Sequence, residues 1–297
     1  MRLVATLVGP AAGSLVDHSL IQSLSRCLVT HGAILEAEDW LSEGEACDIF
    51  LDAQEIQATK ELLSTELLGT GIDFAVQSPA GRRKGLLVAD MESTIIPQEM
   101  IDELALRQGI GEEIAVITHK SMRGELNFEA SLRERVALLK GIDETELAKL
   151  SGLMTLNPGA DILVRTMKKH GAYTALVSGG FTYFTSQIKD LCHFDEDRAN
   201  TLLIENGRLS GQVSEPILGR EAKLEATQDL ASKLNITLSN VCAIGDGAND
   251  LDMLSTVGMG IGYHSKPIVQ KTAAFLINHT DHQAALFYQG YRREDFC

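Results

Sequence analysis

The sequence predicts an α/β protein, in which a Rossmann-like parallel sheet with an inserted helical cap follows a smaller ferredoxin-like α+β domain. Its length of 297 residues is large for one hydrophobic core, so two domains are the default expectation. The first 78 residues read as strand–helix–strand–strand–helix–strand, which is the order of a ferredoxin-like sandwich. Beyond residue 85, short apolar runs alternate with helical patterns, as they do in parallel α/β sheets.

The N-terminal domain is expected to span residues 1–78. Its first segment, RLVATLVG, reads as a strand, because the apolar stretch is too brief for a secretory signal. A helix is expected from Asp17, with Gly32 as its stop. Two strands, a helix and a last strand are predicted in the segments AILEAEDWL, ACDIFLDA, EIQATKELLSTELLG and IDFAVQ. This order of elements resembles that of ACT-type regulatory domains.

A linker is expected at residues 79–85, where Pro, Gly and three cations separate two apolar segments. The second domain is then expected to cover residues 86–297. Its buried strands are predicted in the runs GLLVAD, AYTALVSGG and VCAIGDG, because each is short, apolar and followed by polar or small residues. Residues from about 97–156 carry helical periodicity and many charges, which we interpret as a small helical cap.

Polar clusters stand where the three predicted strands end. They comprise Asp90 and Glu92, then Ser178, Gly179 and Gly180, and finally Asp246, Asn249 and Asp250. The carboxyl ends of parallel strands meet at one edge of a sheet, and ligands bind outside that edge. We therefore expect the three clusters to line one crevice.

These residue types suit phosphoryl transfer, which needs a nucleophile, neutralisation of the phosphate charge and an acid for the leaving oxygen. Asp90 can be the nucleophile, since a carboxylate can form an aspartyl-phosphate. Glu92 can reach the leaving oxygen with its side chain while its backbone carbonyl points toward a metal. Asp246 supplies a second carboxylate for that metal, with Asn249 and Asp250 in or near its shell. Such oxygen ligands suit Mg²⁺, which also offsets the repulsion between crowded carboxylates.

Other residues of the clusters suit phosphate binding. Ser178 and the Gly179 amide, which we place at a helix N-terminus, can hold phosphate oxygens. Lys223, in the helical segment GREAKLEATQDLASKL, would add a point charge on the same oxygens or on Asp90. Taken singly, the clusters also read as a helix cap, a loop, a turn and a solvated helix face. The case for a site is that all of them fall, in chain order, at one edge of the predicted sheet.

The segments DMEST and SGG, the residue Lys223 and the segment GDGANDLDML resemble the four motifs of the haloacid dehalogenase-like phosphatases. The likeness runs from about residue 85 to 290, and the segment QEMIDELA…SMRGELNFEASLRERVALLKG is similar to the cap of the phosphoserine phosphatases in that group. The resemblance implies Asp90 as nucleophile, Glu92 as general acid and base, and Mg²⁺ on Asp90, the carbonyl of residue 92 and Asp246. It implies phosphate binding and support of the site by Ser178, Gly179, Lys223, Asn249 and Asp250.

Within the cap, the resemblance implies how phosphoserine is recognised. Glu99 would bind the ammonium group, and Arg135 would bind the carboxylate, which a guanidinium can hold in a bidentate manner. Phe128 would pack against the substrate, with Met122 nearby. Without the resemblance, Glu99 and Arg135 would read as ordinary surface charges.

The chain departs from the family pattern at one catalytic position, where Glu92 stands in place of Asp. The added methylene extends the acid by about 1 Å or more, and a misplacement of that size can cost roughly a hundredfold in rate. Two interpretations stay open: the site accommodates Glu92 with ordinary turnover, or the chain is a slow enzyme or a trapped variant.

The resemblance implies a Mg²⁺-dependent phosphoserine phosphatase that hydrolyses O-phospho-L-serine through an aspartyl-phosphate, as the last step of serine biosynthesis. The alternatives are phosphoryl transfer to an alcohol such as homoserine, and a catalytically weak protein that senses an amino acid. A net charge of −15 argues against nucleic-acid binding, and the sequence has no apolar span typical of a membrane helix. Five cysteines without a CxxC spacing fit reduced thiols in a cytoplasm. The element order of the first domain leaves a homodimer open.

Overall fold

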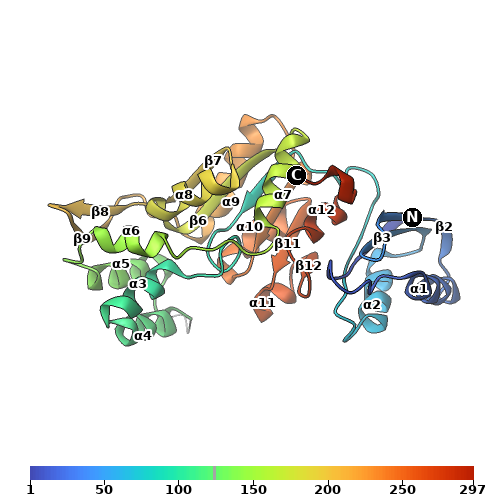
Figure 1. Cartoon of the computed structure of the whole chain (residues 1–297), viewed down its shortest axis with the longest axis horizontal. Helices are drawn as coiled ribbons and strands as arrows, with labels where there is room; N and C mark the ends of the chain where they lie inside the picture. The colour runs from blue at the N-terminus through green and yellow to red at the C-terminus, as the bar shows by residue number, and fades with distance from the viewer. Residues whose placement is uncertain (123–124) are drawn as a thin grey trace.

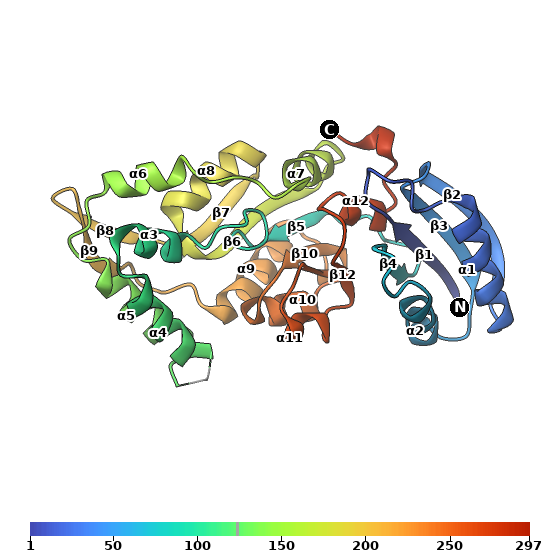
Figure 2. The ribbon, with the colours of Figure 1, turned by 60° about the horizontal axis from the view of Figure 1, so that its bottom comes forward.

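The computed structural model describes residues 1–122 and 125–297, except for the side chain of Met122. Within these residues it contains a four-stranded sheet, a six-stranded sheet and a two-stranded hairpin. We call the first two the small sheet and the large sheet. In Figures 1 and 2 the small sheet lies at one end of the molecule, the large sheet in the middle, and a group of helices at the other end.

The small sheet has the predicted ferredoxin-like order. Its elements are β1 (Arg2–Val8), α1 (His18–Thr30), β2 (Ile34–Ser42), β3 (Ala46–Asp52), α2 (Ile56–Glu66) and β4 (Asp73–Gln77). The strands pair antiparallel in the order β2-β3-β1-β4. Asp17 caps α1 as expected, because its Oδ1 accepts a hydrogen bond of 2.8 Å from the Leu20 N–H, which has no partner inside the helix.

The large sheet is parallel throughout, in the order β12-β11-β10-β5-β6-β7, which confirms the predicted Rossmann-like class. Its strands are β5 (Leu86–Ala89), β6 (Tyr173–Phe181), β7 (Glu196–Asn200), β10 (Val241–Gly245), β11 (Met259–Tyr263) and β12 (Phe275–Ile277). The three predicted strands are neighbours, with β5 between β10 and β6. The polar clusters that follow them are therefore brought to one edge of the sheet.

Helices cover both faces of the large sheet. They are α7 (Ala160–Lys169), α8 (Thr182–Cys192), α9 (Arg220–Lys233), α10 (Leu251–Thr256), α11 (Pro267–Gln270) and α12 (Ala284–Tyr288). Successive residues of β5 alternate between two separate core clusters, with Leu87 and Ala89 in one and Leu86 and Val88 in the other. Burial on both faces explains why the strand reads as a continuous apolar run instead of an alternating pattern.

Of the five helices that the described residues form between β5 and β6, the first four lie where the sequence predicts a cap. They are α3 (Met100–Gln108), α4 (Gly111–Met122), α5 (Phe128–Leu138) and α6 (Thr145–Ser151), and we call them the cap helices. A hairpin that the sequence does not predict, β8 (Leu202–Glu205) and β9 (Arg208–Val213), lies beside them in both views. Leu209 joins it to the cap, since its carbonyl accepts from the Gly141 N–H and its N–H donates to the Ile142 carbonyl, each at 2.8 Å.

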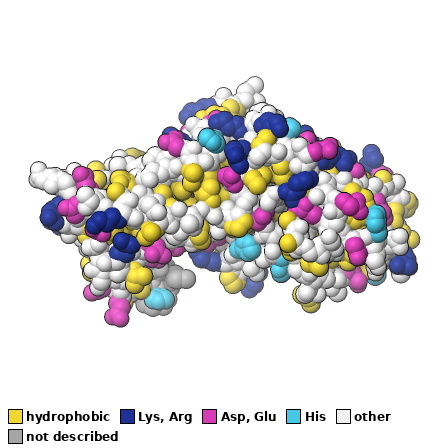
Figure 3. All heavy atoms as spheres, in the orientation of Figure 1, with side chains coloured by type: hydrophobic (Ala, Val, Ile, Leu, Met, Phe, Trp, Pro, Cys, Tyr) yellow, Lys and Arg dark blue, Asp and Glu magenta, His cyan; other side chains and the backbone are white. Residues whose placement is uncertain are grey.

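The surface of the molecule is mixed in charge. Lys and Arg side chains are interspersed with Asp and Glu over the face shown in Figure 3. In residues 1–122 and 125–297, no helix combines the length and the hydrophobicity needed to cross a membrane. All five cysteines are free thiols.

The small sheet packs closely against the C-terminal part of the chain. Helix α12 contacts β1 and β4, and Val8 and Ala75 belong to the same core cluster as Phe287. The buried Asp73 carboxylate accepts hydrogen bonds from three consecutive backbone N–H groups, at residues 278–280, at 2.8–3.0 Å, and a fourth from the Thr280 hydroxyl at 2.7 Å. A carboxylate held by so many donors forms a strong polar anchor between the two parts of the chain.

Replacing Asp73 by Ala should therefore loosen this contact. The substitution leaves the donors of residues 278–280 without their charged acceptor, so we expect the free energy of unfolding to fall by about 2–4 kcal/mol. Urea unfolding followed by circular dichroism measures this loss. The matched control is Asp52→Ala, which removes a half-exposed carboxylate paired with the N-terminus and should cost less than about 1 kcal/mol. Equal losses in the two variants would contradict the anchor.

Candidate active site

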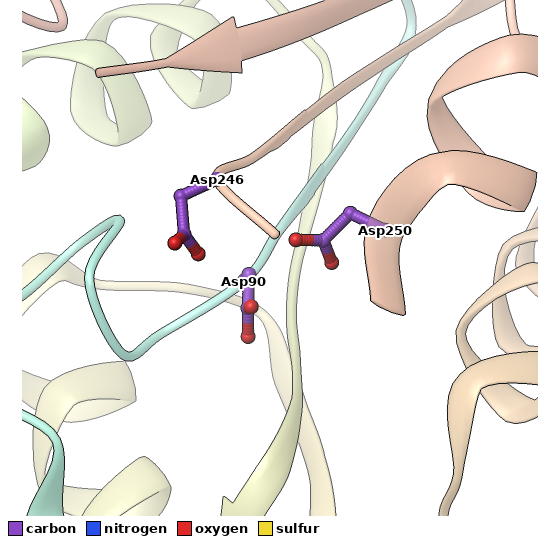
Figure 4. A group of neighbouring side chains, drawn as sticks. All are labelled: Asp90, Asp246 and Asp250. Atoms are coloured by element: carbon purple, nitrogen blue, oxygen red, sulfur yellow. The ribbon is translucent and has the colours of Figure 1, made fainter. Parts of the chain in front are cut away.

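Three carboxylates meet at the carboxyl edge of the large sheet. Asp90 follows β5, Asp246 follows β10, and Asp250 lies at the start of α10. One oxygen from each lies within 4.8 Å of the others, and all three side chains are buried. Figure 4 shows the carboxyl groups gathered around a shared region between these elements. The predicted convergence of the first and third clusters is therefore present in the structure.

Lys223, on α9, places a cation inside this group. Its Nζ lies 2.6 Å from Asp90 Oδ2 and 2.6 Å from Asp250 Oδ1, and the side chain is only 2% exposed. Burial by itself lowers the pKa of Lys223, but the two carboxylates outweigh burial and raise that pKa above its ordinary value. Lys223 is thus a fixed positive charge that pairs with two of the three carboxylates, and it does not lie on a solvated helix face.

Burial, together with the neighbouring carboxylates, raises the pKa of Asp90 and of Asp246. Burial raises the pKa of Asp90; Lys223 opposes this, and Asp250 and Asp246 add to it. Burial likewise raises the pKa of Asp246, against the effect of Lys266, whose Nζ lies 3.1 Å from Asp246 Oδ2. Three carboxylates beside one buried cation form a set of hard oxygen donors with surplus negative charge, which could hold a divalent metal ion.

Ser178 and Gly179 lie on the neighbouring strand, in a different local structure from the one expected. Strand β6 continues through Phe181, and α8 begins only at Thr182, so Gly179 is not at a helix N-terminus. The Ser178 hydroxyl accepts a hydrogen bond of 3.0 Å from the Gly180 N–H, near the end of the strand. We call residues 178–180 the phosphate loop, after the phosphate-binding role that the sequence predicts for them, although they belong to β6 in the structure. Asn249 Nδ2 lies 3.5 Å from Asp90 Oδ2, at the limit of a hydrogen bond.

Glu92 lies between this edge and the cap helices. Its Oε1 accepts a hydrogen bond of 3.0 Å from the Met100 N–H, the first amide of α3. A Cβ built on Gly180 would lie 3.1 Å from Glu92 Oε2, so the carboxyl group packs directly against that glycine. Burial, the neighbouring Glu99 charge and the Asp90 charge raise the pKa of Glu92 to about 8, while the Met100 hydrogen bond and Arg135 oppose the rise. The longer side chain is accommodated by a helix start on one side and a glycine on the other.

Three of the predicted cap residues lie near Glu92 or the phosphate loop. Glu99 is the N-cap residue of α3 and accepts a hydrogen bond of 2.7 Å from the Ser93 hydroxyl. Phe128 covers Gly179, because a Cβ built on that glycine would lie 3.0 Å from Phe128 Cζ. Arg135 lies half-buried on α5, and its charge opposes the rise in the pKa of Glu92. The Met122 side chain lies outside the described residues.

Three contacts near the site are not predicted from the sequence. Ser93 holds Glu99, Lys266 pairs with Asp246, and Asn200 donates a hydrogen bond of 2.9 Å to the Gly179 carbonyl. Ser93 and Lys266 lie within twenty residues of predicted site residues in the sequence. The sequence does not indicate which residues they contact. Asn200 ends β7, an edge strand with the polar sequence EDRAN, and its place beside Gly179 follows from the pairing of β7 with β6.

The sequence and the fold of the chain are similar to those of known hydrolases. The family model described as haloacid dehalogenase-like hydrolase matches residues 87–255. A phosphoserine phosphatase of Streptomyces coelicolor is 38% identical over 252 residues, which cover 84% of this chain but only 62% of that relative. A phosphoserine phosphatase of Streptococcus thermophilus is 40% identical over 198 residues, covering 67% of this chain and 92% of that relative. The crystal structure of a haloacid dehalogenase family hydrolase from Salmonella enterica serovar Typhi has a TM-score of 0.86 at 28% identity and covers 97% of this chain and 98% of its own.

The contact between Glu92 and Gly180 can be tested without any assumption about the reaction. In Gly180→Ala the new Cβ would lie 3.1 Å from Glu92 Oε2 and 3.2 Å from Oε1, the oxygen that the Met100 amide holds in place, so we expect a loss of about 1–2 kcal/mol in the free energy of unfolding. In the Glu92→Asp background the shorter side chain withdraws, and the same Ala should cost close to nothing. Urea unfolding of the two single variants and the double variant gives the coupling energy. Additive effects would show that the two residues do not contact.

Proposed function

The chain belongs to the haloacid dehalogenase-like hydrolases, and from this premise we propose that it is a phosphoserine phosphatase that converts O-phospho-L-serine and water to L-serine and phosphate. The observation that carries the proposal is the buried group of Asp90, Asp246 and Asp250 around the Lys223 ammonium, at the carboxyl edge of a parallel sheet. Its relatives at about 40% identity are phosphoserine phosphatases, which supports the choice of substrate.

In this proposal Asp90 is the nucleophile. Its Oδ1 accepts a hydrogen bond of 2.7 Å from the Met91 N–H and its Oδ2 is held by Lys223, so the carboxylate has a fixed orientation. A bond forms between an Asp90 oxygen and phosphorus while the bond from phosphorus to the serine oxygen breaks. The Glu92 carboxyl group gives its proton to the departing serine oxygen. In the second half, the Glu92 carboxylate takes a proton from a water molecule that attacks phosphorus, and Asp90 is released with phosphate.

We assign the remaining contacts of the phosphoryl group to Ser178, Gly179, Lys223 and Asn249. Lys223 can balance the charge of phosphate oxygens, and the phosphate loop offers a hydroxyl and backbone amides beside it. Asp250 supports the site through its ion pair with Lys223 and by accepting a hydrogen bond of 3.1 Å from the Gly247 N–H.

Mg²⁺ is the cofactor we propose, held by Asp90, the backbone carbonyl of Glu92 and Asp246. The fit rests on the donor set, because Lys223 leaves part of the charge of the carboxylate group uncompensated. When bound, a divalent cation would neutralise negative charge on the phosphoryl group and keep the neighbouring carboxylates ionised. Asp246, whose only cationic partner among the described residues is the half-exposed Lys266, is the carboxylate most in need of such a charge.

Substrate recognition is assigned to the cap helices. Glu99 would bind the ammonium group of phosphoserine, Arg135 its carboxylate, and Phe128 would pack against the substrate, with Met122 nearby. Support comes from the position of Glu99 at the start of α3, next to Glu92, and of Phe128 over Gly179. The cap thereby joins the two halves of the substrate to the catalytic edge.

The proposal also assigns a role to the N-terminal domain. We assign an ACT-like regulatory or dimerising role to residues 1–78, a linker to 79–85 and the phosphatase to 86–297, with its cap at about 97–156. Phosphatases such as the one from Streptococcus thermophilus match only 67% of this chain, which supports a catalytic unit separate from the first domain. We also propose a cytoplasmic location and a place as the last step of serine biosynthesis, consistent with five free thiols and the proposed product.

The proposed function is tested by release of inorganic phosphate from a panel of phosphorylated amino acids and sugars. With Mg²⁺ present we expect O-phospho-L-serine to be the best substrate, and chelation of the metal to abolish release. Asp90→Asn, which keeps the size of the nucleophile, should lower turnover by at least about a thousandfold with an unchanged circular dichroism spectrum. Near-normal turnover by Asp90→Asn would exclude a covalent aspartyl intermediate. Formation of phosphohomoserine when homoserine is added would instead identify a phosphotransferase.

Glu92→Asp tests the unusual acid. The shorter side chain loses the Met100 hydrogen bond and moves the carboxyl group by about 1 Å, so we expect kcat to fall roughly 10- to 100-fold while KM changes little. Steady-state kinetics with phosphoserine measures both constants. Glu92→Gln is the control for length, because it keeps the reach of the side chain and removes the proton, and it should lose at least as much. An unchanged kcat in both variants would remove Glu92 from acid–base catalysis.

A further inference from the structure

Asn200, the last residue of β7, has no role in the reaction proposed above, yet its side chain is fully engaged beside the phosphate loop. It is only 2% exposed. Its Nδ2 donates to the Gly179 carbonyl at 2.9 Å and to the Leu218 carbonyl at 3.2 Å, and its Oδ1 accepts from the Leu218 N–H at 2.7 Å. One carboxamide therefore joins the phosphate loop to a segment almost forty residues further along the chain.

The two joined segments form the surface on which the Phe128 ring of the cap packs, and we call this surface the seat of Phe128. A Cβ built on Gly179 would lie 3.0 Å from Phe128 Cζ, and one built on Gly219 would lie 3.4 Å from Phe128 Cδ1. The Phe128 ring thus lies across both glycines, one on each side of the Asn200 bridge. The separation of the two segments decides how deeply the ring sits over the phosphate loop.

The second segment also leads directly into the helix that carries the buried cation. Leu218 and Gly219 immediately precede α9, which begins at Arg220, and Gly219 is its N-cap residue without a capping side chain. Lys223 lies on the first turn of α9 and reaches Asp90 and Asp250. The bonds from Asn200 to Leu218 therefore fix the start of the helix from which Lys223 projects.

We propose that Asn200 is a positioning residue: its carboxamide holds Gly179 and Leu218 in register, and so builds both the phosphate-binding backbone and the seat of Phe128. This inference rests on the proposed phosphatase function. The pattern of two donated bonds and one accepted bond requires an amide of this length. Aspartate keeps only the acceptor, because an ionised carboxylate has no donor, and leucine keeps only the volume.

The test compares Asn200→Asp and Asn200→Leu with Gln289→Leu. Gln289 is a matched control, because it is also a fully buried amide, it donates to the Ala285 carbonyl at 3.0 Å and accepts from the Lys84 N–H at 3.1 Å, and it follows α12 at the far end of the large sheet. The dissociation constant of inorganic phosphate is measured by calorimetry on the full chain with Mg²⁺, beside KM, kcat and the midpoint of thermal unfolding. We expect both Asn200 variants to bind phosphate about tenfold more weakly and to raise KM by a similar factor. Gln289→Leu should lower the unfolding midpoint and leave phosphate affinity unchanged.

A second comparison separates positioning from a general loss of stability. If Asn200 acts through the seat of Phe128, then Asn200→Asp should raise KM less in a Phe128→Ala background than in the wild type. Unchanged phosphate affinity in folded Asn200→Asp, or an equal loss in Gln289→Leu, would overturn the inference. If the wild type binds phosphate but does not hydrolyse phosphoserine, the proposed function fails while the calorimetric comparison still decides the role of Asn200.

Discussion

The contact of one lysine with two buried aspartates is the interaction on which the rest of the site depends. Removing Asp90, Asp246 and Asp250 from water is costly unless positive charge lies beside them. Lys223 supplies that charge at 2.6 Å from two of them and is itself held ionised by their presence. Because Lys223 lies on α9, Asp90 follows β5 and Asp250 begins α10, the ion pairs also fix α9 against the sheet edge.

Glu92 connects this charged edge to the cap. Its carboxyl group is held by the first amide of α3, and the residue that caps that helix, Glu99, is in turn held by Ser93 on the same loop as Glu92. The start of α3 and the proposed catalytic acid are thus parts of one local structure. The glycine of the phosphate loop that faces Glu92 leaves room for the added methylene, which gives the substitution of Glu for Asp a structural basis.

Contacts that begin in the small sheet also support the loop that carries Glu92. Asp73 anchors the segment 278–280, and His282 two residues later is bonded to the Pro158 carbonyl through its backbone N–H at 3.3 Å. Asn157, next to Pro158, donates from its side chain to the Thr94 carbonyl at 2.6 Å and from its backbone to the Ile95 carbonyl at 2.8 Å. The loop after Asp90 is therefore held by contacts that begin in the first domain.

The sequence by itself determined the central strands, the cap insertion and the identity of the acidic cluster. These signals are local: Leu86–Ala89 is buried on both faces and reads as an apolar run, and the polar residues follow it directly. Tertiary structure alone decided which residues from distant segments contact each other. The half-exposed edge strand that ends at Asn200 lacks an apolar run, and the partners of Asp73 stand 205–207 residues away in the chain. Asn200 and Asp73 gain their roles only when the sheets close and bring donors to them, because a hydrogen bond between distant segments leaves no periodic trace in the residues that make it.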